Sequence, residues 1–273
     1  EEGAECLILS EQFNYRLEDA HNWTLQEKRQ KKILSYKGMK DNSELQFDYN
    51  PAWEEVKLDY ALVRNGEQEL RISEAEINLM DAPWVGAAPR YPGGKTLVAS
   101  LPGVQIGSVI EYQVTRSYRG LPYFYVMLSF QSQDAIVRRE LSIDCPSDLR
   151  LHSKLYPNGY LNFKRRSKAA QVKYERSNDK QRHIQRWSVV NQAALSRERA
   201  LPPAHSYLPT VVAWSGSWKD YTEQLARSFD FASQGGKALN ELLQALKKMP
   251  DDTRLLSLRN HIERGVRRAG PYF

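Results

Sequence analysis

The sequence predicts a mainly β protein: a twisted antiparallel β-sandwich over residues 1–195, an extended, proline-rich linker over 196–216, and a C-terminal segment of about three helices over 217–273. Three observations lead to this prediction. Apolar and polar residues alternate in short runs through the first two thirds of the chain, turn residues separate the runs, and after residue 216 the apolar period changes from two to about 3.6. Many short strands joined by short turns favour antiparallel sheets over a parallel α/β sheet.

Long alternating runs open the chain. ECLILSEQFNYRL predicts a first strand and WTLQEKRQKKILSY a second, whose middle is highly charged. Residues 37–55 lose the alternation and are rich in turn formers, so we expect an irregular connection there. EVKLDYALV then alternates again, RNGEQ turns the chain because Asn-Gly adopts positive φ at little cost, and ELRISEAEI returns. This pattern predicts a β-hairpin.

The middle of the chain continues the same rhythm after a loop. Residues 81–95 are rich in proline and glycine and predict that loop. Further strands are predicted in the runs KTLVASL, VIEYQVTRSY, YFYVMLSFQS, AIVRRELSIDCP, LRLHSKLYPNG, YLNFKRR, AQVKYERS and HIQRWSVV.

Three helices are predicted after the linker, each from an apolar stripe with helical spacing. Ser215 or Ser217 can cap the first helix, and Asp251 or Asp252 can cap the third. The stripes are Trp218, Tyr221, Leu225 and Phe229; Leu239, Leu242, Leu243 and Leu246; and Leu255, Leu258, Ile262 and Val266.

Composition and cysteine usage restrict the class of protein. The hydrophobic fraction of 41% over 273 residues is enough for a core, and no apolar run approaches the ~18 residues of a membrane span. No signal peptide opens the chain, although removal of one would leave such a start. Cys6 and Cys145 could form one disulfide bridge; the favoured interpretation is that both are small packing residues in strands.

Positive charge is concentrated in one region. The net charge is +6, and residues 161–186 carry nine Lys and Arg against Glu175 and Asp179. The favoured interpretation is a solvated outer sheet face, with an anionic partner such as a polysaccharide, lipid headgroup or cell-wall polymer as the alternative; nucleic acid is not expected. The candidate residues for an anionic-partner surface are Arg165, Arg166, Lys173, Arg176, Arg182 and Arg186.

Patterns that carry catalytic or metal chemistry are weak in this sequence. Its five histidines each stand more than four residues from any other histidine or cysteine, which disfavours a local metal site. Neither cysteine begins a helix, AWSGSW does not match G-x-S-x-G, and YPGGK lacks phosphate-loop spacing. We therefore predict no catalytic, cofactor-binding or metal-binding residue, and no enzymatic activity for this chain.

One stretch matches a known pattern. Residues 97–118, LVASLPGVQIGSVIEYQVTRSY, contain Pro-Gly-Val at 102–104, Gly-Ser at 107–108 and Ile-Glu-Tyr at 110–112. This order resembles a family of bacterial domains of unknown function that stand N-terminal to transglutaminase-like (papain-like) cores in exported proteins. KKILSYKGMKDN, VKLDYALVRNGEQELRIS, AIVRRELSIDCPSDLRL and LPTVVAWSGSWKDYTEQL resemble other parts of it in the same order. The resemblance therefore covers nearly the whole chain.

The resemblance implies a non-catalytic accessory or scaffold domain, periplasmic or extracellular, that positions or covers a cysteine-dependent core or binds an extracellular partner. Its partners would be that C-terminal core and a cell-envelope polymer or protein. In the family the nucleophilic cysteine follows a glycine at a later helix start. Neither Cys6 nor Cys145 occupies that place, and we expect such a core to lie beyond Phe273, so the resemblance assigns no catalytic residue to this chain. The alternatives are a stand-alone carbohydrate or anionic-polymer binding module and a structural or adhesive surface protein.

Overall fold

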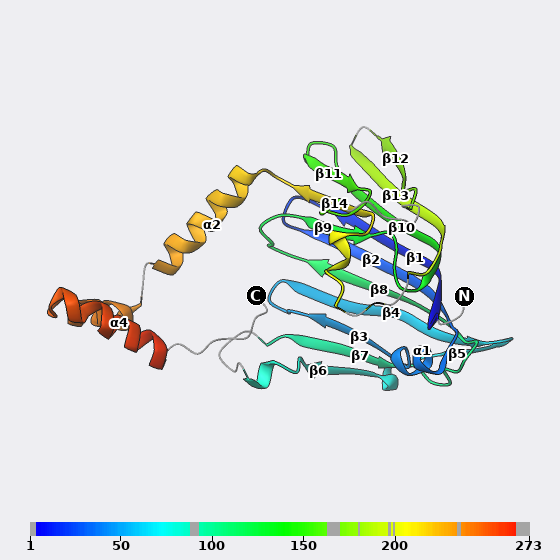
Figure 1. The fold of residues 1–273 in the computed structure, drawn as a ribbon, viewed down its shortest axis with the longest axis horizontal. Helices are drawn as coiled ribbons and strands as arrows, with labels where there is room; N and C mark the ends of the chain where they lie inside the picture. Colours follow the sequence, from blue (N-terminus) through cyan, green and yellow to red (C-terminus); the bar gives the residue numbers. More distant parts are fainter. Residues whose placement is uncertain are drawn as a thin grey trace. The chain divides into compact units, whose positions relative to one another are not determined.

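The computed structural model describes residues 4–87, 93–162, 170–179, 181–195, 198, 200–233 and 236–265 (Figure 1). Within these residues the chain is mainly β, with mostly antiparallel sheets and a helical part toward the C-terminus, as the sequence predicts. It divides into two compact units. We call residues 1–82 with 93–216 the β unit, and residues 83–92 with 217–273 the helical unit.

Strands make up most of the β unit, with one short helix and two short 3-10 turns. The elements are β1 (Cys6–Leu17), β2 (Trp23–Ile33), α1 (Tyr36–Asp41), β3 (Glu44–Tyr49), β4 (Glu54–Asn65), β5 (Gln68–Arg71), η1 (Glu74–Glu76), β6 (Ile77–Asp81), β7 (Lys95–Ser100), β8 (Val109–Tyr118), β9 (Tyr125–Ser129), β10 (Ala135–Pro146), β11 (Leu151–Tyr156), β12 (Lys173–Asn178), β13 (Arg182–Gln192), η3 (Ala204–Ser206) and β14 (Thr210–Ser215).

One large sheet and two small sheets organise these strands. The eight-stranded sheet has the order β12-β13-β10-β1-β2-β8-β4-β5, and the small sheets have the orders β11-β14-β9 and β3-β7-β6. The expectation of wholly antiparallel pairing is wrong at one place, since β1 and β10 pair in parallel. Parallel neighbours need a long connection to bring the chain back in the same direction, and residues 18–134 form it.

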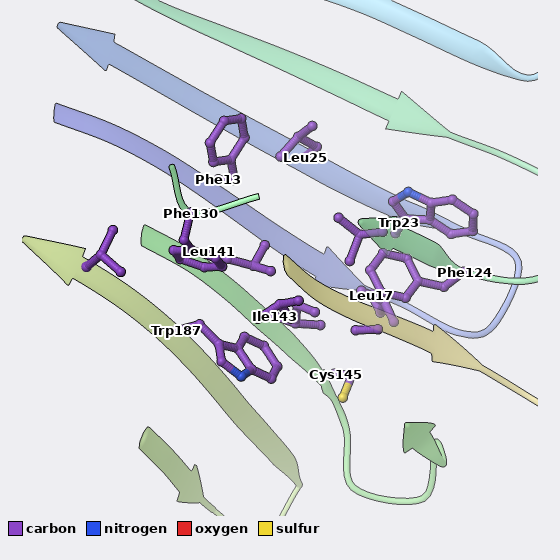
Figure 2. Packing of buried hydrophobic residues seen from close by; sticks show 14 of the residues in the cluster. Phe13, Leu17, Trp23, Leu25, Phe124, Phe130, Leu141, Ile143, Cys145 and Trp187 are labelled. Carbon is purple, nitrogen blue, oxygen red and sulfur yellow. The ribbon is translucent and has the colours of Figure 1, made fainter. Parts of the chain in front are cut away.

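Two hydrophobic clusters lie on the large sheet. The first joins β1, β2, β10 and β13 to the small sheet that contains β9 and β14, with Phe124, Phe130 and Leu141 fully buried in it (Figure 2). The second joins β1, β2, β4 and β8 to β3 and β7 around Phe47 and Ala99. The apolar side chains that alternate along each strand therefore meet side chains of a second sheet, which removes them from water.

A β-bulge lets β1 serve both clusters. The register with β2 shifts between Ile8 and Ser10, so an extra residue is accommodated there. Cys6 and Ile8 before the bulge are buried, and so are Phe13 and Leu17 after it, although the two sets differ in parity along the sequence. Strict alternation alone would place these sets on opposite faces.

The two cysteines are buried packing residues, as the favoured interpretation expects. Cys6 lies in the second cluster and Cys145 in the first. The parallel register pairs Ile8 with Ile136, so Cys6 lies beside the start of β10 while Cys145 lies near its end. About ten strand residues, on the order of 30 Å, separate the two thiols, which is far beyond the reach of a disulfide.

Residues 37–55 are more regular than predicted. They contain most of α1 and all of β3, which pairs with β7. Ser35 caps the helix by accepting a hydrogen bond from the amide of Gly38 at 3.0 Å. The helix has only six residues, too few to show a helical period, and β3 buries only Phe47, so neither element has a strong pattern in the sequence.

Part of the predicted linker is a sheet strand. β14 is the central strand of its small sheet, paired with β11 on one side and with β9 on the other. All its residues except Trp214 are buried. The run TVVAWS is short and follows prolines, which is why it resembles an extended connection when the neighbouring strands are unknown.

The helical unit contains α2 (Trp218–Ser233), α3 (Lys237–Lys247), α4 (Asp251–Gly265) and the 3-10 turn η2 (Val85–Ala87). Ser217 caps α2 as predicted: its hydroxyl accepts a hydrogen bond from the Asp220 amide at 3.3 Å, and the Asp220 carboxylate accepts one from the Ser217 amide at 2.7 Å. Val266 of the third predicted stripe lies outside the described residues. No helix in the described ranges combines the length and apolar character needed to cross a bilayer.

A glycine substitution tests the packing of the loop after β11. Gly159 has φ +74°, and a Cβ there would lie 2.3 Å from the Tyr207 amide nitrogen and 2.4 Å from the Ser206 carbonyl carbon. Gly120 has φ +65° with nothing within 4 Å of an added Cβ. Both changes to alanine carry the left-handed backbone cost of about 1–2 kcal/mol. We expect Gly159→Ala to lower the free energy of unfolding in urea by roughly 1–3 kcal/mol more than Gly120→Ala; equal losses would contradict this close approach.

Candidate functional site

The predicted anionic-partner surface falls on β12 and β13. On β13, Arg186 alternates with buried Trp187 and therefore points to the outer face of the large sheet. The same alternation places Arg182 on that face, and so does the register for Lys173, which lies two residues from the Arg186 partner Glu175. Arg176 pairs with Gln185, which places it on the opposite face. Arg165 and Arg166 lie outside the described residues.

The three outer-face cations have acidic neighbours. Salt bridges join Lys173 to Glu175 at 2.5 Å, Arg182 to Asp144 at 2.7 Å and Arg186 to Glu140 at 3.1 Å. Charges of both signs are therefore interspersed over β12, β13 and β10. The structure does not bring the predicted basic residues together into one cationic cluster within the described part of the chain.

A Cys–His pair is the contact that spacing along the sequence could not reveal. The register of β10 with β13 pairs Cys145 with His183, and the Cys145 Sγ lies 2.9 Å from the His183 Nε2. Burial raises the pKa of the Cys145 thiol to about 11 and lowers the pKa of His183. A cysteine nucleophile needs a lowered thiol pKa and access to substrate, and this buried pair has the opposite properties. We assign it to the core.

The described part of the chain holds no group of three or more His, Cys, Asp and Glu side chains arranged to bind a metal ion.

The Pro-Gly-Val and Gly-Ser turns dock onto the β4–β5 hairpin. The Asn65 side chain donates to the carbonyl of Gly103 at 2.8 Å and contacts the Ser108 hydroxyl. Gly103 and Gly107 have φ of +70° and +94°, where glycine is the least strained residue. The Gly107 amide donates to the carbonyl of Ile33 at 2.8 Å, which fixes the turn against the end of β2. These motif residues therefore have structural roles.

Glu111, the acidic residue of the motif, is the centre of a polar cluster on the outer face of the large sheet. Its carboxylate accepts hydrogen bonds from Gln30 Nε2 at 2.6 Å, Arg64 Nη1 at 2.7 Å and Tyr60 Oη at 2.8 Å, and the Lys28 Nζ lies 3.3 Å away. Burial alone would raise the pKa of Glu111, but these donors outweigh it and lower the pKa to about 2. The cluster ties β2, β8 and β4 together.

A row of charged and hydrogen-bonding side chains crosses the inner face of the same sheet. We call it the ion ladder: Arg139, Glu11, Arg29 and Tyr112 are register neighbours on β10, β1, β2 and β8. Glu11 accepts from Arg139 Nε at 2.6 Å and lies 3.3 Å from Arg29 Nη1. Glu27 lies 2.6 Å from Arg29 Nε and accepts from the Tyr112 hydroxyl at 3.2 Å. Buried charges are thereby paired.

The outer face of the small sheet β11-β14-β9 carries aromatic rings. Along β14, Val211 and Ala213 face the first cluster, so Trp214 points away from it. Register places Tyr125 of β9 and His152 of β11 on either side of Trp214. We call this surface the aromatic face and define it as Tyr125, His152, Lys154, Tyr156, Tyr160 and Trp214.

Ring contacts order the aromatic face. The rings of His152 and Trp214 stack with their centroids 5.3 Å apart. The ring centroids of Tyr156 and Tyr160 lie 4.2 Å apart. Tyr160 comes from the loop after β11, where its amide donates to the carbonyl of His205 at 3.0 Å. Burial and the neighbouring hydroxyls of Tyr125 and Tyr156 raise the pKa of Tyr160 to about 12. Sequence reasoning missed this surface because its residues come from separate short strands.

Comparison with known proteins identifies the family. Residues 19–196 match the sequence profile described as a domain of unknown function with solved structure, DUF3857. The chain belongs to the DUF3857 family. The domain matched by the profile ends within the β unit. The match confirms that the chain belongs to a family of domains of unknown function, as the Pro-Gly-Val, Gly-Ser and Glu-Tyr motif predicts. No functionally curated protein matches the chain.

Solved structures extend the DUF3857 comparison. A "putative protease" from Parabacteroides distasonis ATCC 8503 is similar over 95% of this chain and 50% of its own, with a TM-score of 0.74 and 17% identity, which shows a shared fold. The chain thus spans about half the length of that protein. The match to an M1 zinc metallopeptidase from Deinococcus radiodurans covers 76% of this chain and 42% of that protein, at 6% identity. Its TM-score of 0.35 is too low for a structural argument.

The pKa of Glu111 predicts a specific dependence of stability on pH. Its folded pKa of about 2 is below the ordinary value of 4.5, so its contribution is fully present above pH 4.5 and is lost as the pH falls through about 2. Glu111→Gln should lower the free energy of unfolding at pH 7 by on the order of 2–3 kcal/mol, and by less at pH 3. Urea unfolding at both pH values measures this. Glu55→Gln, at an exposed carboxylate, is the control; a pH-independent Glu111→Gln loss would contradict the prediction.

Removing one partner of the ion ladder should be costly. Arg139→Met leaves Glu11 buried with Arg29 as its remaining cation, and we expect a loss of about 3–5 kcal/mol in the free energy of unfolding. The double variant Glu11→Leu/Arg139→Met should recover much of that loss, because no charge is left unpaired. Arg138→Met is the matched control: its side chain is 56% exposed, and its loss should stay within about 1 kcal/mol. Equal losses for Arg138→Met and Arg139→Met would refute the ladder's importance.

Proposed function

We propose that this chain is the non-catalytic N-terminal accessory part of an exported protein with a transglutaminase-like, cysteine-dependent core. In this proposal the β unit is a sandwich-type scaffold, and the three helices α2, α3 and α4 lead into the core. The observation that carries it is the similarity to the "putative protease": nearly all of this chain corresponds to half of that longer protein. Fold similarity at 17% identity does not transfer an activity, so the core and its chemistry belong to the proposal.

Exposed apolar side chains on the helices support a further packing partner. Trp218 and Phe229 of α2 are 82% and 66% exposed, and Leu255 of α4 is 76% exposed. Burying a side chain of this size yields about 1.5–3 kcal/mol, and clusters of exposed apolar residues commonly mark interaction surfaces. We infer that these residues pack against the proposed core.

The chemistry of the described thiols supports an accessory role. Cys145 is fully buried beside His183, and burial raises the pKa of its thiol to about 11. Cys6 is also buried, in the second cluster. Both cysteines have packing roles, so we place the nucleophile of the proposed enzyme in the core.

The family resemblance supports a proposal for location and partners. We propose a periplasmic or extracellular protein whose β unit positions or covers the core, or holds an envelope component near it. The resemblance to domains of exported proteins supports this location, and the exposed helix residues support the core as a partner.

Activity measurements on two lengths of the protein test the proposal. The chain of 273 residues and the full-length product of its gene are each assayed for hydrolysis of a fluorescent casein substrate and for amine incorporation into casein. We expect the longer protein to have one of these activities and to lose it on treatment with iodoacetamide, whereas the 273-residue chain has neither. Activity of the shorter chain would overturn the accessory role, and full activity after replacement of every cysteine would overturn the cysteine-dependent core.

A further inference from the structure

We propose that the aromatic face binds an acidic polysaccharide, a chain of pyranose sugars that carry carboxylates. This site is distinct from the helix surface proposed to contact a core, and it does not depend on that core or on its activity. The inference rests on the combination of exposed rings, a cation and a local lack of acidic residues on one sheet face.

Exposed rings provide the stacking surface. Tyr125 and Tyr160 are 47% and 44% exposed, and Trp214 is partly exposed between Tyr125 and His152. The C–H faces of a pyranose ring are apolar while its hydroxyls point outward around the rim, so a sugar can stack on an aromatic ring and keep its hydroxyls hydrated. Tyrosine and tryptophan suit such a boundary because each combines an apolar ring with a polar group.

The geometry of the sheet fits an extended ligand. The row Tyr125–Trp214–His152 crosses three adjacent strands, a width of about 10 Å. Tyr156 lies four residues from His152 along β11, which is about 13 Å. The rings therefore extend over a distance longer than one sugar, although Thr210 and Val212, on the same side of β14 as Trp214, are buried. A linear polysaccharide can contact several of these rings together.

Charge selects the acidic class of sugar. The strands β9, β11 and β14 contain no Asp or Glu, in contrast to the β12–β13 region with its Lys173–Glu175 pair. Lys154 is exposed on this face, with its Nζ 4.7 Å from the centre of the Tyr156 ring. A carboxylate on a sugar stacked at Tyr156 would meet this ammonium group, which favours anions through a charge-assisted hydrogen bond.

The loop after β11 holds Tyr160 in place. Hydrogen bonds run from the Tyr160 amide to the His205 carbonyl at 3.0 Å and from the Leu161 amide to the Ser206 carbonyl at 2.9 Å. The close approach of Gly159 to Ser206 and Tyr207 fixes the turn that precedes it. The Tyr160 backbone is fixed in this way, and its ring packs beside the rings of Tyr156 and His205. Such a side chain loses little conformational freedom on binding, which strengthens the affinity.

Affinity electrophoresis of the 273-residue chain tests the site. Native gels containing polygalacturonate, alginate or neutral cellulose-derived polymer report retardation, and titration with oligogalacturonate yields dissociation constants. We expect retardation by at least one of the two acidic polymers and not by the neutral one. Tyr160→Ala and Tyr125→Ala should each raise the dissociation constant about three- to tenfold. Lys154→Gln should raise it about two- to fivefold at low salt and less at high salt.

Matched controls separate the site from general effects. Tyr36→Ala removes a tyrosine that is 63% exposed on α1, and Lys57→Gln removes an exposed lysine on β4; both should bind like the unaltered chain. Circular dichroism and thermal melting confirm that each variant is folded. The proposal is overturned if neither acidic polymer retards the chain, if the neutral polymer binds as well, or if Lys57→Gln weakens binding as much as Lys154→Gln, which would indicate diffuse attraction to the net positive charge.

Discussion

The ion ladder is the interaction on which the large sheet most depends. Arg139, Glu11, Arg29 and Tyr112 follow one another across four strands, at the place where the two hydrophobic clusters adjoin the same sheet face. A slip of one residue between β1 and β10 or between β1 and β2 would separate Glu11 from Arg139 or from Arg29 and weaken the pairing of a buried charge, at a cost of several kcal/mol. The ladder therefore specifies register, including that of the parallel β1–β10 pair.

The family motif is explained by the same constraint. Glu111 and Tyr112 are adjacent on β8 and point to opposite faces: Glu111 collects donors from β2 and β4 on the outer face, and Tyr112 donates to Glu27 on the inner face. The preceding Gly103 and Gly107 turns hold the β4–β5 hairpin through Asn65. The motif that identifies the family in the sequence thus aligns three neighbouring strands, β2, β8 and β4.

The side chains that could take part in catalysis and the surfaces proposed to bind partners lie in different places. Cys145 and His183 contact each other inside the β unit, where burial raises the pKa of the thiol and lowers the pKa of the imidazole. The exposed rings used in the two proposals include Trp218 of α2 and Tyr125 of the small sheet β11-β14-β9. This separation is what we expect of the proposed accessory domain, which would contact a catalytic core through its helices and a polysaccharide through the aromatic face.

The sequence alone determined the β class, the hairpin at Asn65-Gly66, the C-terminal helical part and the family, because these depend on local periodicity, turn chemistry and an ordered motif. Tertiary structure alone decided the parallel pairing of β1 with β10, the meeting of Cys145 with His183, and the gathering of Tyr125, Trp214 and Tyr160 on one face. Each of these joins residues that are far apart in sequence, and only the register between strands, fixed by burial of charge and apolar surface over the whole sheet, brings them together.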